Sequence, residues 1–383
     1  MEIRKELPEI FKSFSEARQA GFISAKNFKD AGNPLIGIFC TYFPQELALA
    51  MGAVTVGLCA SSDETITESE KDLPRNLCPL IKSSYGFGKT DKCPYFYFSD
   101  LVVGETTCDG KKKMYEYMAE FKPVHVMKLP HSQDQVAKEL WKQEIIKMKE
   151  VLEEQFAVSI TEEKLHKAIL LKNEERKAMK EFYGLCRQDP SPMTGMELFN
   201  VLVGASFDFD REALPSKIRD LTQKVQEEYQ IIQNNEIKPR ILITGCPMGA
   251  ATAKVIKAIE DNGAVVVCFE NCTGVKAVEE LVDEHNLDLF GALAEKYLNI
   301  GCSCMSPNTK RFELLNRLID EYKVDGVVEM TLTACHTYNV ESLSVKRFVQ
   351  QEKGRPYTYL ETDFGTSDVE RINTRMTAFI EML

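Results

Sequence analysis

The chain has 383 residues, a formal net charge of −11, a hydrophobic fraction of 44% and a charged fraction of 27%. A chain of this length exceeds what one hydrophobic core usually serves, so two or three domains are expected. The composition is that of a soluble globular protein, and the acidic charge argues against nucleic-acid binding, which needs a basic surface. The first residues are charged and no apolar run is long enough to cross a bilayer, so we expect a cytoplasmic protein without membrane contact.

The N-terminal part alternates between strand and helix patterns. Apolar spacing predicts a helix over residues 8–31, and later helices begin near Pro44 and Asp109. Short apolar runs predict four strands, at residues 35–39, 54–58, 101–104 and 124–127. Such alternation is typical of a doubly wound parallel sheet.

Between residues 133 and 237 glycine is rare, and amphipathic Glu- and Lys-rich runs predict long helices at 152–185 and 215–232. We interpret this part as a helical bridge between two α/β lobes, with a coiled-coil partner surface as the alternative. The predicted domains are an N-terminal α/β lobe at 1–132, the helical bridge at 133–237 and a C-terminal α/β lobe at 238–383.

The second lobe repeats the order of the first. Residues 240–268 read as strand, cysteine, helix and strand, as do residues 36–58. In this comparison Cys40 corresponds to Cys246, Cys108 to Cys335, and Cys78 to Cys302 or Cys304. The predicted fold is therefore an α/β protein with two Rossmann-like, doubly wound parallel-sheet lobes that are related by internal duplication and joined by a helical bridge.

Two cysteines stand where a strand ends and a helix begins. Cys108 precedes the helix that Asp109 opens, and Cys335 with His336 repeats this arrangement. Open α/β sheets bind ligands at the carboxyl ends of their strands, and a helix N-terminus lowers the pKa of a thiol. We therefore expect a ligand site at these cysteines.

The twelve cysteines are not expected to form disulfides in a reducing compartment, and no Cys-x-x-Cys pair indicates a zinc knuckle. Four of them are interpreted as buried hydrophobes: Cys59, Cys93, Cys186 and Cys268. The other eight lie in loops or at strand ends: Cys40, Cys78, Cys108, Cys246, Cys272, Cys302, Cys304 and Cys335. Thiolates that converge from two lobes suit soft metals and above all iron–sulfur clusters, while structural zinc is the weaker alternative.

Two further residues could move protons. Glu46 lies about one helical turn beyond Cys40 and is either an acid–base group or a buried carboxylate that caps a loop. His336 is either a proton donor or a capping residue. The basic run from Lys111 to Lys113 is interpreted as a solvated helix face.

Several stretches together resemble one known superfamily, that of the 2-hydroxyacyl-CoA dehydratases and benzoyl-CoA reductases, most closely its double-cubane cluster branch. The likeness covers nearly the whole chain. The stretches that carry it are Cys40–Glu46, Asp72–Cys78, Thr107–Glu116, Gly245–Gly249, Glu270–Gly274, Gly301–Cys304, Ala334–Tyr338 and Glu361–Asp363.

The resemblance implies an iron–sulfur cluster held in the cleft between the lobes. Cys78, Cys108 and Cys335 match the positions that hold one [4Fe-4S] cluster in the dehydratases. Cys40, Cys272 and Cys304 are assigned to a second cubane, which would complete a double cubane [8Fe-9S], and the alternative ligands are Cys246 and Cys302.

The function implied is a low-potential iron–sulfur reductase of small molecules, a homodimer that receives electrons from a separate ATP-dependent [4Fe-4S] activator. Glu46 and His336 are the candidate proton donors. The first alternative is a 2-hydroxyacyl-CoA dehydratase subunit with a single [4Fe-4S] cluster. The second is a non-catalytic cluster carrier or structural metal protein.

Overall fold

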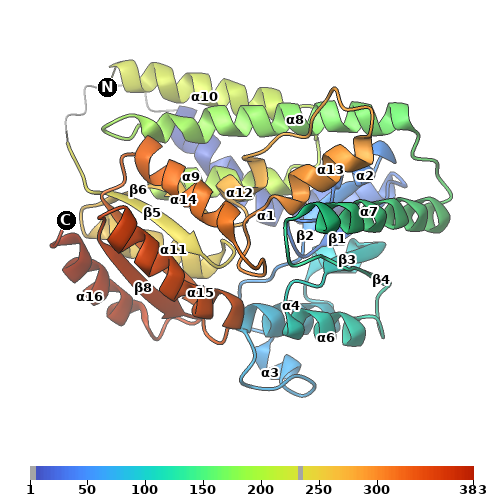
Figure 1. Ribbon diagram of the computed structural model, residues 1–383, viewed down its shortest axis with the longest axis horizontal. Helices are drawn as coiled ribbons and strands as arrows, with labels where there is room; N and C mark the ends of the chain where they lie inside the picture. Colours follow the sequence, from blue (N-terminus) through green and yellow to red (C-terminus); the bar gives the residue numbers. More distant parts are fainter. Residues whose placement is uncertain (1–5, 232–235) are drawn as a thin grey trace.

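The computed structural model describes residues 6–231 and 236–383, which form two α/β lobes and a layer of long helices across them (Figure 1). Each lobe holds a sheet of four parallel strands, in the orders β2-β1-β3-β4 and β6-β5-β7-β8. The strands are β1 (Leu35–Ile38), β2 (Val54–Gly57), β3 (Leu101–Glu105), β4 (Val124–Met127), β5 (Arg240–Gly245), β6 (Val265–Phe269), β7 (Gly326–Leu332) and β8 (Tyr357–Thr362). The matching strand orders confirm the predicted two-lobed α/β fold.

Helices cover the sheets, so the central strands β1, β3, β5 and β7 are buried along their whole length. The helices are α1 (Glu6–Asp30), α2 (Gln45–Ala50), α3 (Ile66–Ser69), α4 (Pro79–Lys89), α5 (Pro94–Phe98), α6 (Asp109–Met118), α7 (Gln135–Phe156), α8 (Glu162–Gly184), α9 (Gly195–Gly204), α10 (Leu214–Ile231), α11 (Ala250–Asp261), α12 (Val275–Val278), α13 (Leu289–Leu298), α14 (Thr309–Glu321), α15 (His336–Arg347) and α16 (Val369–Ile380). Three short helical turns complete the described chain: η1 (Leu185–Arg187), η2 (Ala205–Phe207) and η3 (Phe348–Glu352).

The prediction of a single helix at residues 152–185 is wrong, because the structure has two helices in this region. α7 ends at Phe156, and Ala157 adopts a left-handed conformation with φ of 51°. Thr161 then caps α8 by accepting a hydrogen bond from the backbone N–H of Lys164. No glycine or proline marks this break in the sequence. The second predicted helix, at 215–232, is α10, although residue 232 lies outside the described residues.

Helix α8 joins the two lobes. It packs on α2 of the first lobe, on α12 and α13 of the second, and on α10, which runs beside it (Figure 1). The domain boundaries at residues 132 and 237 remain a prediction. In the described part of the chain, no helix combines the length and the apolar character that a membrane crossing requires.

The end of β5 requires glycine. Gly245 has a φ of 113°, and a Cβ at this position would collide with the backbone carbonyl of Met330 on the neighbouring strand β7. Glycine at position 245 therefore has a steric reason.

We predict that Gly245→Ala lowers the free energy of unfolding by more than about 1 kcal/mol, because both the backbone conformation and the close strand contact oppose a side chain. Gly57→Ala is the matched control, since an added Cβ there meets no atom within 4 Å. Chemical denaturation of both variants measures the difference. Equal stability of the two would contradict this steric account.

Candidate functional site

The strand-end cysteines lie at the carboxyl edges of both sheets. Cys40 follows β1 and Cys108 follows β3, while Cys246 follows β5 and Cys335 follows β7. Four cysteines are N-cap residues: Cys78 before α4, Cys93 before α5, Cys108 before α6 and Cys335 before α15. All twelve cysteines are free thiols.

A first thiol group consists of Cys78, Cys246 and Cys335. Hydrogen bonding from Cys246 and then from Cys78 lowers the pKa of Cys335 well below its usual value. The same contact with Cys335 raises the pKa of Cys78, and burial raises the pKa of Cys246. The three thiols thus contact one another and come from both lobes.

A second thiol group consists of Cys40, Cys272, Cys302 and Cys304. Hydrogen bonding from Cys304 lowers the pKa of Cys302 to about 5. The sulfurs of Cys272 and Cys302 lie 3.9 and 3.8 Å from the hydroxyl of Tyr338. Cys40, from the first lobe, interacts electrostatically with Cys272 and Cys302 of the second.

Cys108 borders both groups, because it interacts electrostatically with Cys335 and with Cys302. Its pKa is raised, since burial outweighs the attraction of Lys111 and of the helix N-terminus. The prediction of a lowered pKa for Cys108 is therefore wrong. A sequence shows the helix start, but only packing shows how completely the thiol is removed from water.

The prediction that Lys111 to Lys113 form a solvated helix face is wrong for Lys111. Lys112 and Lys113 pair with Asp109 and Glu116 on the helix surface, as a solvated face would. Lys111 instead is buried, and its ammonium lies 3.3 Å from the carbonyl of Phe39. Burial opposes its charge, yet Tyr115 and the neighbouring thiols raise the pKa of Lys111 well above its usual value. It is a fixed positive charge beside Cys40 and Cys108.

The donor set is sulfur alone and comes from both lobes, which fits the soft irons of an iron–sulfur cluster. Among the residues that the structure describes, no three or more His, Cys, Asp or Glu side chains are arranged to hold a single metal ion, so the fit to a cluster rests on the type of donor and not on a set of ligands already in place.

Glu46 is buried and fully engaged. Its carboxylate lies 2.7 Å from the guanidinium of Arg176 and accepts a hydrogen bond of 2.7 Å from the hydroxyl of Tyr297. Burial opposes ionisation, but Arg176 brings the pKa of Glu46 below its ordinary value. These contacts fit the alternative of a buried structural carboxylate better than an acid–base role. His336 is the first residue of α15 and is exposed.

Glu105, which sequence reasoning missed, ends strand β3 three residues before Cys108. Neither carboxyl oxygen accepts a well-formed hydrogen bond from a described residue. The backbone N–H of Phe43 lies nearby and opposes the rise in pKa that burial causes. Burial raises the pKa of Glu105 to about 7. A charged residue at the end of an apolar strand was the available signal. Glu105 is thus a buried group that can hold a proton near neutral pH.

The raised pKa predicts a pH dependence of stability. The folded state of Glu105 binds more protons than the unfolded state between pH 4.5 and about 7, so stability falls as pH rises through this window. The shift corresponds to at most about 3 kcal/mol. We expect Glu105→Gln to gain in thermal midpoint relative to wild type between pH 5 and pH 8. A constant difference across this range would contradict the assignment.

A buried ionic network lies behind the second thiol group. The guanidinium of Arg311 lies 3.3, 3.2 and 2.6 Å from the carboxylates of Glu270, Glu329 and Glu341. Lys276 also pairs with Glu270, at 2.6 Å. The Arg311 guanidinium and the Lys276 ammonium lie 5.1 and 5.6 Å from the ring centre of Tyr338. The network therefore supports the tyrosine that contacts Cys272 and Cys302.

We predict that Arg311→Met destabilises the protein by roughly 3–5 kcal/mol, because three carboxylates lose a buried cationic partner and, among the described residues, only Glu270 keeps another, Lys276. The matched control is Arg347→Met on the exposed face of α15, which should change stability by less than about 0.5 kcal/mol. Thermal and chemical unfolding measure both. A loss below 1 kcal/mol for Arg311→Met would show that the network is dispensable.

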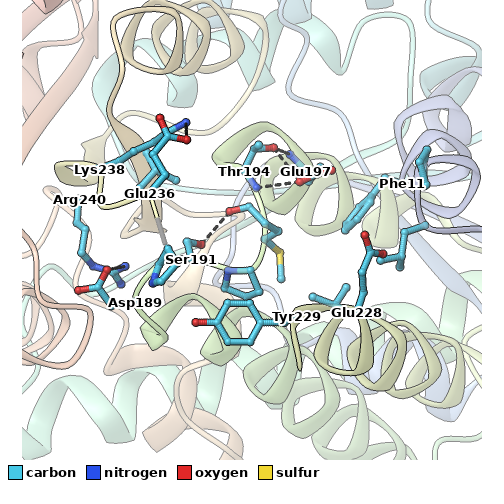
Figure 2. Close-up of a pocket in the computed structure, with 17 residues that line it drawn as sticks. Phe11, Asp189, Ser191, Thr194, Glu197, Glu228, Tyr229, Glu236, Lys238 and Arg240 are labelled. Carbon is cyan, nitrogen blue, oxygen red and sulfur yellow. Dashed lines mark hydrogen bonds and ion pairs between the residues drawn. The ribbon is translucent and has the colours of Figure 1, made fainter. Parts of the chain in front are cut away.

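Two cavities are candidate ligand sites. The first, of about 200 Å³, lies between the lobes and α8, and Cys40, Cys59 and Cys272 are among its lining residues. The second, of about 230 Å³, is lined by residues of α1, α10 and the loop before α9 (Figure 2). Its polar groups serve one another: Thr194 and Glu197 form a capping box, and Ser191 donates to the carbonyl of Met193. Of these two, the first cavity is the one that reaches the thiols discussed above.

Comparisons with known proteins show the family to which the chain belongs. The model of the family "2-hydroxyglutaryl-CoA dehydratase, D-component" matches residues 40–383, and the chain belongs to this family. It is 57% identical to "Putative dehydratase subunit YjiM" of Escherichia coli (strain K12), over 100% of both chains. It is 26% identical to the beta chain of (R)-phenyllactyl-CoA dehydratase of Clostridium sporogenes, over 94% of both chains. Identity to a benzoyl-CoA reductase subunit of Thauera aromatica is 23%, over 94% of this chain and 91% of that protein. The resemblance to the superfamily of 2-hydroxyacyl-CoA dehydratases and benzoyl-CoA reductases is confirmed, and its double-cubane branch stays a prediction.

Proposed function

We propose that this chain is the catalytic iron–sulfur component of a low-potential reductase of small molecules, with a cluster of the double-cubane type. The observation that carries the proposal is the convergence of cysteines from both lobes into two adjoining thiol groups bordered by Cys108. Sets of cysteine thiolates hold iron–sulfur clusters, and their surroundings set the reduction potential.

The proposed ligands are Cys78, Cys108 and Cys335 for one cubane and Cys40, Cys272 and Cys304 for the other. Cys246 and Cys302 are the alternatives. Geometry strengthens the case for both, because Cys246 contacts Cys335 and Cys302 contacts Cys304. When bound, the cluster would supply low-potential electrons to a substrate.

The chain's own residues would support that chemistry. Lys111 offers a fixed positive charge beside the thiolates, which favours their ionised form. The hydroxyls of Tyr42 and Tyr338 lie within hydrogen-bonding distance of Cys304, Cys272 and Cys302. Glu105 can hold a proton near neutral pH and is a better candidate proton donor than Glu46, whose carboxylate is committed to Arg176. His336 remains a second candidate.

The electron donor in this proposal is a separate ATP-dependent [4Fe-4S] activator, and the working form is a homodimer in the cytoplasm. Partner proteins are supported by relatives that are named as subunits of dehydratases and of a reductase. The ATP-dependent activator itself follows from the resemblance to the superfamily.

A 2-hydroxyacyl-CoA dehydratase subunit with one [4Fe-4S] cluster is the second candidate, and the family and several relatives favour it. The cavity of about 200 Å³ beside Cys40 and Cys272 favours the reductase, because it lies below the size range of pockets for drug-sized ligands and far below that of a CoA thioester.

Iron and sulfide analysis of anaerobically purified protein tests the proposal. A double cubane predicts about eight irons per chain and a single cubane about four. Cys40→Ser should lose up to about half of the iron and retain the rest, while the control Cys186→Ser, at a buried position in η1, should lose none. Comparison of Cys246→Ser with Cys108→Ser identifies which of them is a ligand.

About four irons in the wild type, unchanged in Cys40→Ser, would contradict the double cubane and favour the dehydratase. Iron-free protein would contradict both. Reduction of a small test substrate that requires activator and ATP would exclude a mere cluster carrier.

A further inference from the structure

The cavity beside Cys40 and Cys272 has a second chemical character besides sulfur. Four of its lining residues are cations, and one is a carboxylate. The cations are Lys172 and Arg176 on α8, Arg211 in the loop after η2, and Lys296 on α13. The strongest cationic neighbours of Cys40 and Cys272 are instead Lys111 and Lys276. The four lining cations are therefore distinct from the strongest counter-charges of the thiols, which do not line the cavity.

The carboxylates within reach do not balance this charge. Glu175 lies 2.6 Å from Lys172 and 3.9 Å from Arg211, so it serves both. Glu46 pairs with Arg176 at 2.7 Å. Four cations thus face two carboxylates, and all of these side chains are buried or nearly so. A buried surplus of positive charge is costly unless a counter-ion joins it.

Of the four cations, Lys296 most clearly lacks a carboxylate partner. Its side chain is 3% exposed, and its ammonium lies 3.3 Å from the carbonyl of Ala277 and 4.0 Å from the ring centre of Tyr297. Among the described residues no carboxylate forms an ion pair with it: Glu46, which attracts it most, is already paired with Arg176, and Glu280, which also attracts it, is exposed. Burial, followed by repulsion from Arg176, lowers the pKa of Lys296 well below its ordinary value, so a bound anion would stabilise its charged form.

We propose that this cavity binds a small monoanion, such as a short-chain carboxylate, with Lys296 as its principal counter-charge. The volume of about 200 Å³ limits the ligand to a small molecule, and Cys40 and Cys272 line the same cavity. The further step of taking this anion as the substrate rests on the proposed function. The binding of the anion to the cavity is independent of the proposed function.

The test is isothermal titration calorimetry on the anaerobically purified full-length protein, with acetate as the probe and acetamide as its neutral counterpart of equal size. HEPES replaces chloride as the buffer anion, because chloride could itself occupy the site. Acetate should bind and acetamide should not. Lys296→Met should weaken acetate binding about tenfold or more, because a buried charged partner is lost, and Lys296→Arg should retain binding.

Lys257→Met is the matched control, since this lysine is exposed on α11 in the second lobe and pairs only with Asp261 among the described residues. It should leave acetate binding unchanged. Equal binding of acetate and acetamide, no acetate binding, or equal losses in the two methionine variants would overturn the proposal. Iron content is measured on the same samples, so that a failure of cluster binding is distinguished from a failure of anion binding. The comparison of acetate with acetamide in the wild type decides the question even if Lys296→Met does not fold.

Discussion

The arrangement of the whole molecule depends on one buried cation. Arg176, on helix α8, reaches Glu46 on α2 of the first lobe and donates a hydrogen bond of 2.9 Å to the hydroxyl of Tyr297 on α13 of the second. Its side chain is 1% exposed. A guanidinium at that depth is tolerated only when its partners are held in place, so the bridge and both lobes are constrained to meet at this point. The same junction lies beside the cavity that Cys40 and Cys272 line.

Around that junction, the cations near the thiols are different residues from the cations that line the cavity. Lys111 stands beside Cys40 and Cys108, and the Arg311 network stands behind Tyr338, which faces Cys272 and Cys302. Positive charge close to thiolates favours ionised sulfur and would stabilise an anionic cluster. The cations around Lys296 lie apart from these, in the cavity wall. Thiols and buried basic side chains are thus brought together where the two lobes and the helical bridge meet.

Several features could be predicted because they have local causes. The strands are apolar runs between turn residues, and Cys108 and Cys335 stand at strand ends before helices, as their local sequence indicates. The strand–cysteine–helix repeat made the twofold architecture visible, and the fold follows it. The break at Ala157 could not be seen, because no residue type marks it and packing of the bridge decides it.

By itself, the sequence determined which residues form strands, where the cysteines stand on them, and which family the chain belongs to. These are properties of hydrophobic period, helix start signals and motif order, which act over a few residues. Only the tertiary structure decided that Cys246 meets Cys78 and Cys335, that Glu46 is committed to an arginine, and that Lys111 and Glu105 are buried. The physical reason is that pairing and desolvation depend on residues far apart in the chain, which come together only when both lobes close on the bridge.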